Sequence, residues 1–379
     1  MRNCVAFILK CTRACNFACS YCSDRQDQSG ALGLEVPALL LKQASALYRS
    51  VDFIYHGGEP LVLGIEYFSK ILVMQKLLNS GNTRFRNLLQ TNGSLIDASW
   101  CDFFKANNVH VGVSLDGPQA VHDAQRRRSD GGPTFDSVAR GVSELASAGV
   151  EKYGLLAVAT EEALHEEPAA LYEFFRSQLH PESVADGDYR EVSVMLERPA
   201  SPPGWRSLGE AHGFLARRRR YAELLCGLYR CWLGRDDVKV RIRELGNKLD
   251  CLVGGRSGIC IEGGCCIGRY FGVDTSGEVA HCDTFFHDSR FRFGNIRTKP
   301  LSEMLRSRRF RDAAALEGEL RRRCRPCPWF SHCRGGCLYE ALLLHDSGLR
   351  DRQAYCPSKP VYDFLAADLA GRLDTKVSS

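Results

Sequence analysis

The sequence has no long apolar run, and this absence excludes whole classes of protein. No stretch approaches the ~18 consecutive apolar residues that a membrane-spanning helix needs. Residues 1–10 contain an apolar run that is too short for the core of a signal peptide, and no small-residue cleavage site follows it. We therefore expect a protein that is neither secreted nor held in a membrane.

Charge of one sign is not in excess either, and the chain has no long internal repeat or low-complexity tract. Its 50 lysine and arginine residues nearly balance its 45 aspartate and glutamate residues. Two short basic runs, at 217–220 and 321–323, lack the interleaved aromatic residues of a nucleic-acid surface. We interpret both runs as solvated helix faces and expect no nucleic-acid partner.

Cysteine, in contrast, is abundant, with 18 residues in a chain of 379. So many cysteines are tolerated either in an oxidising environment, as disulfides, or in a reducing one, as metal ligands. Because the sequence has no secretion signal, it predicts a cytoplasmic protein whose cysteines bind metal.

The most informative cysteines are the three in the run Cys15-Asn-Phe-Ala-Cys19-Ser-Tyr-Cys22. They can supply three thiolates to a [4Fe–4S] cluster and leave its fourth iron open to bind a substrate. The spacing, with Tyr21 just before the last cysteine, resembles the signature of the radical S-adenosylmethionine (radical SAM) superfamily. The resemblance implies that the open iron chelates SAM, and that reductive cleavage gives a 5′-deoxyadenosyl radical that abstracts hydrogen. The alternative is a zinc knot or a set of structural thiols.

Apolar runs alternate with segments of helical period over the first half of the chain. The expected strands lie at 4–10, 51–56, 85–90, 110–115, 153–160 and 191–196. The expected helices lie at 36–49, 65–78, 97–107, 134–148 and 168–178, with a longer one at 210–232. Six β/α repeats with parallel strands predict an α/β fold with a curled sheet, a partial (β/α)6 TIM-type barrel. The radical SAM resemblance implies the same fold.

The motif Gly57-Gly58-Glu59-Pro60 ends the second expected strand. Glycines there allow backbone carbonyls to approach a ligand ammonium group, and Glu59 can supply a carboxylate. The motif resembles the GGE motif of the radical SAM family, which implies that these residues bind the methionine amino group of SAM. By itself, Gly-Gly is only a turn signal.

Polar residues also end the third and fourth expected strands. Their short side chains suit hydrogen bonds to ribose hydroxyls or to a carboxylate. The resemblance assigns Ser114 to SAM, and we place Asn92 and Asp116 on the same wall. Arg126, in a segment that resembles the family's HDxxR element, can clamp a carboxylate. Tyr21 either packs near the adenine or belongs to the core.

A second group of cysteines, near the C-terminus, has the spacing C-x2-C-x5-C-x3-C followed by one more. This spacing resembles the SPASM extension, a small Cys-rich domain that binds two auxiliary iron–sulfur clusters. The resemblance assigns the first auxiliary [4Fe–4S] cluster to Cys260, Cys266, Cys282 and Cys337, and the second to Cys324, Cys327, Cys333 and Cys356. A zinc site is the alternative, since C-x2-C pairs also occur in zinc ribbons. Either Cys265 or Cys266 can be the ligand, because two adjacent cysteines cannot easily bind one cluster together.

Asp283 directly follows Cys282 and is the candidate catalytic residue. In sulfatase-maturing enzymes, which the chain resembles in length and in cysteine spacing, an aspartate at this position deprotonates the substrate as its radical is oxidised. A carboxylate beside an anionic cluster should have a raised pKa, which suits a base that works near neutral pH. A structural hydrogen-bonding role is the alternative.

The expected domains are a radical SAM barrel at 1–200, a linker and helical region at 201–253, and a SPASM domain at 254–379. We expect a peptide maturase that oxidises or cross-links a peptide, because His56 stands where sulfatase-maturing enzymes usually have glutamine. One alternative is an anaerobic sulfatase-maturing enzyme, which forms formylglycine. Another is a small-molecule enzyme that performs dehydrogenation or sulfur insertion. The expected electron donor is a flavodoxin or ferredoxin.

Overall fold

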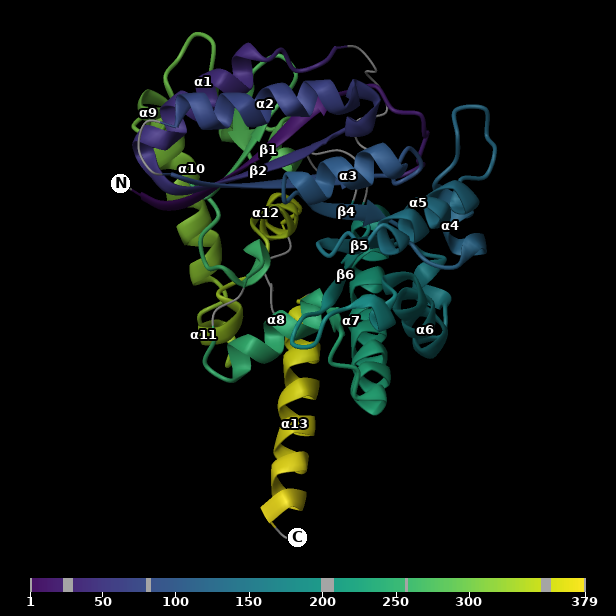
Figure 1. Ribbon diagram of the computed structural model, residues 1–379. Coiled ribbons are helices and arrows are strands. Elements are labelled where there is room, and N and C mark those ends of the chain that lie inside the picture. The colour runs from purple at the N-terminus through teal and green to yellow at the C-terminus, as the bar shows by residue number, and fades with distance from the viewer. Residues whose placement is uncertain are drawn as a thin grey trace.

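The computed structural model describes residues 2–22, 30–79, 83–198, 208–255, 258–348 and 356–377 (Figure 1). Its strands are β1 (Arg2–Thr12), β2 (Tyr48–Gly57), β3 (Arg84–Thr91), β4 (His110–Ser114), β5 (Tyr153–Ala159), β6 (Arg190–Leu196), β7 (Val240–Ile242), β8 (Tyr270–Val273), β9 (Glu278–His281) and β10 (Arg292–Asn295). Its helices are α1 (Glu35–Leu47), α2 (Gly64–Leu78), α3 (Ala98–Ala106), α4 (Gln119–Gln125), α5 (Phe135–Ser147), α6 (Pro168–Leu179), α7 (Leu208–Arg235), α8 (Arg243–Leu252), α9 (Leu301–Met304), α10 (Arg308–Arg322), α11 (Phe330–Cys333), α12 (Leu338–Asp346) and α13 (Ser358–Val377).

The first six strands are parallel neighbours in chain order, so the predicted α/β fold with a parallel barrel sheet is confirmed. Alternation explains their register: in β5, every second side chain is buried. The helices return the chain and cover the sheet with an apolar stripe. In α5, for example, Val138, Val142 and Leu145 are buried at helical spacing. The carboxyl ends of these parallel strands therefore all lie at the same end of the sheet, where ligands bind in such folds.

The sheet extends beyond the six predicted strands at both edges. The short strand β7 pairs with β6, and on the other side β8 pairs in parallel with β1. A hairpin turn at 275–277 joins β8 to β9, since these two strands are antiparallel and Gly277 has a φ of +84°. One sheet of ten strands thus crosses both predicted domain boundaries. The first residues of the predicted linker and helical region, 201–207, lie outside the described residues.

The C-terminal helix α13 projects from the body of the molecule, and its first turns pack against α7 and α8 (Figure 1). Val361, Tyr362 and Leu365 anchor it, since all three side chains are fully buried. Within the described ranges, we find no helix with the length and apolar character needed to span a bilayer.

Candidate functional site

The loop that carries Cys15, Cys19 and Cys22 follows β1 and is tied to the protein on two sides. On one side, the backbone N–H groups of Gly58 and Glu59 donate to carbonyl oxygens of the loop at 2.7 and 2.8 Å. On the other side, loop N–H groups donate to carbonyls of residues 125 and 127, after α4. The three thiols face one another closely enough to interact electrostatically. Burial is the main reason why the pKa of the Cys15 thiol is raised to about 11.

Gly57 and Gly58 are required by the close approach of this loop. A Cβ atom on Gly57 would collide with the carbonyl oxygen of Thr12, and one on Gly58 with that of Ala14. Gly57 also has a φ of +119°, which side-chain-bearing residues rarely adopt. The glycines therefore allow the end of β2 to approach the cysteine loop, a packing role that the sequence did not indicate.

Glu59 is completely buried and joins the ends of β2 and β3. Its Oε1 accepts hydrogen bonds from Leu61 N at 2.9 Å and from Thr91 Oγ1 at 2.7 Å, and its Oε2 accepts from Asn92 N at 2.7 Å. Burial raises the pKa of this carboxyl to about 7. With three protein donors and no exposed surface, Glu59 holds the strand ends in position instead of presenting a free carboxylate.

Asn92 and Ser114, which we predicted on the SAM wall, lie at the carboxyl ends of β3 and β4. The Asn92 amide donates to Asn16 Oδ1 at 2.8 Å, and its nitrogen lies 4.0 Å from the sulfur of Cys15. Ser114 Oγ accepts from Gln90 Nε2 at 2.9 Å. Asn92 thus contacts the cysteine loop directly, while Ser114 lies one strand further along the sheet.

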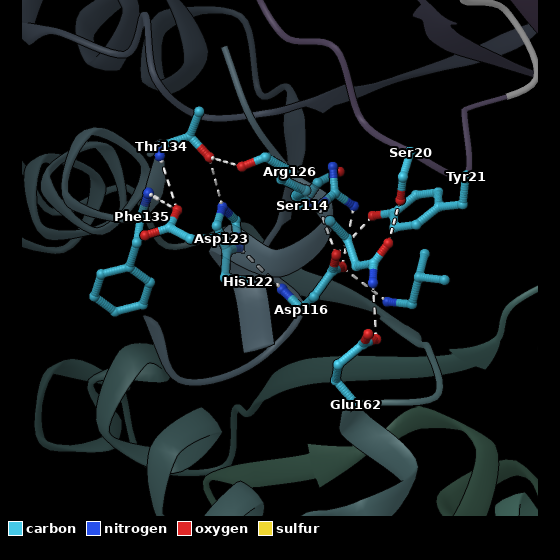
Figure 2. A network of polar contacts seen from close by, with 12 residues as sticks. Ser20, Tyr21, Ser114, Asp116, His122, Asp123, Arg126, Thr134, Phe135 and Glu162 are labelled. Atoms are coloured by element: carbon cyan, nitrogen blue, oxygen red, sulfur yellow. Dashed lines mark hydrogen bonds and ion pairs between the residues drawn. The ribbon is translucent and has the colours of Figure 1, made fainter. Parts of the chain in front are cut away.

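Asp116, Arg126 and Tyr21 form one network at the side of the cysteine loop (Figure 2). Arg126 Nε and Nη2 donate to the two carboxylate oxygens of Asp116 at 2.9 and 3.1 Å, and the Tyr21 hydroxyl donates to Asp116 Oδ2 at 2.6 Å. Burial alone would lower the pKa of Arg126, but the Asp116 carboxylate more than offsets it, so the pKa is raised. The carboxylate that Arg126 clamps is therefore that of Asp116, not one that is left free for a ligand.

His122 contacts this network through Asp116 and Thr134. It was not among the predicted site residues, although it belongs to the HDxxR-like segment. Its Nδ1 accepts from Asp116 N at 3.4 Å, and its Nε2 lies 3.1 Å from Thr134 Oγ1, which itself donates to Arg126 O at 2.6 Å. These partners require a neutral ring with its proton on Nε2. Burial lowers the pKa of His122 to about 4, which agrees with the neutral form.

In the C-terminal part of the chain, five predicted cluster ligands line one cavity. Its walls include Cys324, Cys327, Cys333, Cys337 and Cys356. The cavity has an empty volume of about 570 Å³, its open mouth included. Lys248 lies beside it, forms a buried ion pair with Glu262, and interacts electrostatically with Cys333 and Cys356.

The other predicted ligands of the first auxiliary cluster lie near Cys337, one of the cavity-lining cysteines. The thiols of Cys260, Cys266 and Cys337 interact electrostatically with one another. Arg198 lies close to Cys282 and to two of these thiols, since its guanidinium interacts electrostatically with Cys282, Cys260 and Cys337. Its Nη2 also donates a hydrogen bond to Cys337 Sγ at 3.6 Å. Cys337 therefore stands where the two predicted ligand sets meet.

The structure distinguishes the adjacent residues Cys265 and Cys266, between which the sequence could not decide. Cys266 is 7% exposed and faces Cys260 and Cys337, whereas Cys265 is exposed and donates to the carbonyl of Ile267 at 3.7 Å.

We expect Cys266→Ser to lose one auxiliary cluster, about four irons per chain, because a ligand facing the other thiols is removed. Cys265→Ser is the matched control and should keep all of its iron. Anaerobic iron and sulfide analysis of the reconstituted proteins measures this, and iron loss from Cys265→Ser alone would reverse the assignment.

Asp283 follows a strained residue, since Cys282 has a φ of +57° and a ψ of 168°. The Cys282 thiol donates to Asp283 Oδ1 at 3.0 Å. Burial would raise the pKa of Asp283, but the charges of Lys10, His56 and Arg198 and this hydrogen bond lower it to about 2. Our prediction of a raised pKa considered only the cluster; the structure adds three basic groups near the carboxylate, and these act in the opposite direction.

The donor chemistry of these groups fits iron–sulfur clusters and SAM. Of the eleven predicted thiol ligands, three lie on one loop and five line one cavity, and Cys260 and Cys266 interact with Cys337 of that cavity. Such thiol-rich groups are the donors that iron–sulfur clusters need. In the part of the chain that the structure describes, no three His, Cys, Asp or Glu side chains are arranged to hold a single metal ion.

A family model described as the radical SAM superfamily matches residues 9–174, and the SPASM model, described as an iron–sulfur cluster-binding domain, matches residues 265–328. The chain is 28% identical over 354 residues to the cysteine-type anaerobic sulfatase-maturating enzyme of Clostridium perfringens, with 91% of each chain covered. It is 29% identical over 341 residues to the serine-type enzyme of Bacteroides thetaiotaomicron, with 85% of this chain and 80% of that protein covered. Among solved structures, native anSMEcpe with bound AdoMet and Kp18Cys peptide has the same fold, with a TM-score of 0.80, 24% identity, and 98% and 99% coverage of the two chains.

Proposed function

Since this chain is a radical SAM enzyme with a C-terminal SPASM domain, which uses SAM and iron–sulfur clusters, we propose that it is an anaerobic sulfatase-maturing enzyme. Such an enzyme oxidises one residue of a sulfatase polypeptide to formylglycine. The observation that carries the proposal is similarity along nearly the whole chain to both cysteine-type and serine-type enzymes. It replaces our preferred prediction of a peptide maturase that oxidises or cross-links a peptide, which His56 had favoured over sulfatase maturation.

In this proposal, the residues of the barrel bind SAM and hold the cysteine loop in place. When bound, the cluster of Cys15, Cys19 and Cys22 and its SAM supply the radical that abstracts hydrogen from the substrate. The polar wall of Asn92 and Ser114 contacts SAM. The remaining predicted binding residues act mainly through position: Gly57, Gly58, Glu59, Asp116, Arg126 and Tyr21 fix the loop against the strand ends.

Asp283 is the proposed base, and its surroundings support this role. Its Oδ1 lies 3.0 Å from the sulfur of Cys282, so the role rests on the position of the carboxylate. It lies beside Cys282, where an electron leaving the substrate would enter the first auxiliary cluster. The same residue can therefore accept the proton as the electron departs.

Three further parts of the proposal extend to cofactors and partners. The eleven thiolates hold three [4Fe–4S] clusters, one that binds SAM and two auxiliary ones. A flavodoxin or ferredoxin supplies the electron for SAM cleavage. The enzyme works in the cytoplasm, where its many thiols stay reduced.

The proposal is tested with sulfatase peptides under anaerobic conditions. Reconstituted enzyme, SAM and dithionite are incubated with matched peptides that carry Cys, Ser or Ala at the modified position. We expect an aldehyde, detected by hydrazide capture and mass spectrometry, from the Cys or the Ser peptide and none from the Ala peptide. Formation of 5′-deoxyadenosine without aldehyde from either peptide, or a cross-linked product, would return the function to the peptide maturase alternative.

A further inference from the structure

The end of helix α10 contains a buried ion pair that the sequence did not suggest. Glu317 and Arg321 lie four residues apart, and their side chains are only 6% and 9% exposed. Arg321 Nη2 donates to Glu317 Oε1 at 2.8 Å and also to the sulfur of Cys266 at 3.2 Å. A guanidinium that few waters reach is therefore aimed at a predicted cluster ligand.

Glu317 fixes the backbone of the same ligand. Its Oε1 accepts from Cys266 N at 2.8 Å and its Oε2 accepts from Ile267 N at 3.1 Å. Together with the Arg321 guanidinium, these two N–H groups give each carboxylate oxygen of Glu317 at least one donor. The backbone and the sulfur of Cys266 are thus held by one ion pair.

Arg321 also reaches the segment that precedes Cys337. Its Nη1 donates to the carbonyl oxygens of Arg334 at 2.6 Å and of Gly336 at 3.2 Å. Gly335 packs closely against Arg321, because a Cβ atom on Gly335 would lie 3.2 Å from Arg321 Cγ, and Gly335 has a φ of +94°. A single guanidinium therefore connects two cysteine-bearing segments that are far apart in the sequence.

The charge of this guanidinium matters as much as its hydrogen bonds. Burying an anionic sulfur is costly, and a cation that donates to it offsets part of that cost. Hydrogen bonds to cluster sulfurs, together with net charge and exposure, also set the reduction potential of iron–sulfur clusters. Losing a donor and a positive charge would favour the oxidised cluster, which carries less negative charge.

We propose that Arg321 is a positioning residue of the first auxiliary cluster, which fixes Cys266 against Cys337 and raises the reduction potential of the cluster. The inference rests on the cluster ligands proposed above and not on the identity of the substrate. Arg321 acts through the sulfur of Cys266 and has no contact with substrate in this role.

The chain offers a matched control in Arg323, two residues further on. Arg323 pairs with Glu319 at 2.7 Å with the same spacing as Arg321 and Glu317, but both side chains are substantially exposed. Arg321→Gln and Arg323→Gln therefore remove the same charge and the same kind of ion pair. Only the first removes a donor to sulfur.

The experiment is a redox titration of the reconstituted auxiliary clusters, followed by electron paramagnetic resonance, in a Cys15/Cys19/Cys22→Ala background that lacks the SAM cluster. In Arg321→Gln, we expect the ratio of reduced to oxidised first cluster at a fixed potential to fall about tenfold, which is a shift of about 59 mV for one electron. Arg321→Lys keeps the charge but not the planar fork, so its shift should be smaller. Arg323→Gln should not shift.

The outcomes separate the alternatives. Loss of about four irons from Arg321→Gln but not from Arg323→Gln also supports the positioning role, and the potential is then read from Arg321→Lys. Full iron with an unchanged potential in both Arg321 variants overturns the proposal, as does an equal shift in Arg323→Gln. Absence of auxiliary clusters from the parent protein overturns the ligand assignment instead. Because no sulfatase peptide is used, none of these results depends on the proposed function.

Discussion

Replacing Cys15, Cys19 and Cys22 by alanine should abolish SAM cleavage while about eight of about twelve irons remain bound. The three thiols lie together on one loop between the ends of β2 and the segment after α4, and the predicted auxiliary ligands lie elsewhere. The loss should therefore be confined to one cluster. Anaerobic iron counting and chromatographic detection of 5′-deoxyadenosine measure the two effects.

The control for this experiment replaces Cys4, Cys226 and Cys231, three cysteines outside the proposed ligand sets. That variant should keep full iron content and SAM cleavage, because none of the three replaced cysteines is a proposed cluster ligand. A wild-type protein with only about four irons, or with bound zinc, would contradict the proposal of two auxiliary clusters.

Replacing Asp283 by asparagine should separate the two halves of the reaction. Hydrogen abstraction precedes deprotonation, so 5′-deoxyadenosine should still form when the substrate peptide is present. Aldehyde product should fall by about 10²–10⁴-fold, the usual effect of removing a positioned base. The ratio of the two products, measured by mass spectrometry, is the decisive quantity.

Asp288→Asn is a suitable control, because Asp288 is a buried aspartate that pairs with Arg290 and does not adjoin Cys282 in the chain. It should leave the ratio unchanged. If Asp283→Asn keeps the wild-type ratio and rate, Asp283 only supports the loop of Cys282, and another base must be sought.

The barrel strands could be predicted because each one has a local signal. The strand at 153–159, for example, alternates in burial and stands between two segments of helical period. Strand β7 has only three residues and exists because β6 is beside it, so its sequence alone carries no such signal. The pairing of β8 with β1 was also missed, since parallel pairing of distant segments leaves no local pattern.

In the candidate site, cysteine spacing predicted the ligands, but their surroundings depended on tertiary contacts. The basic runs at 217–220 and 321–323 were interpreted as solvated, yet Arg218 and Arg321 are buried and paired with Glu340 and Glu317. In the same way, nothing near Asp283 in the sequence indicated the cations around it. A charge in a helical segment can be assigned to solvent or to the core only when the packing of that helix is known.

The pairing of β1 with β8 also constrains how the chain folds. Residues 6–9 complete their hydrogen bonds on one side only when residues 270–273 are available, which is late in synthesis. Until then, the buried side chains of β1 lie next to an open strand edge, the type of surface on which chains aggregate. We therefore expect the N-terminal barrel to keep an open edge at β1 until β8, from the C-terminal part of the chain, pairs with it.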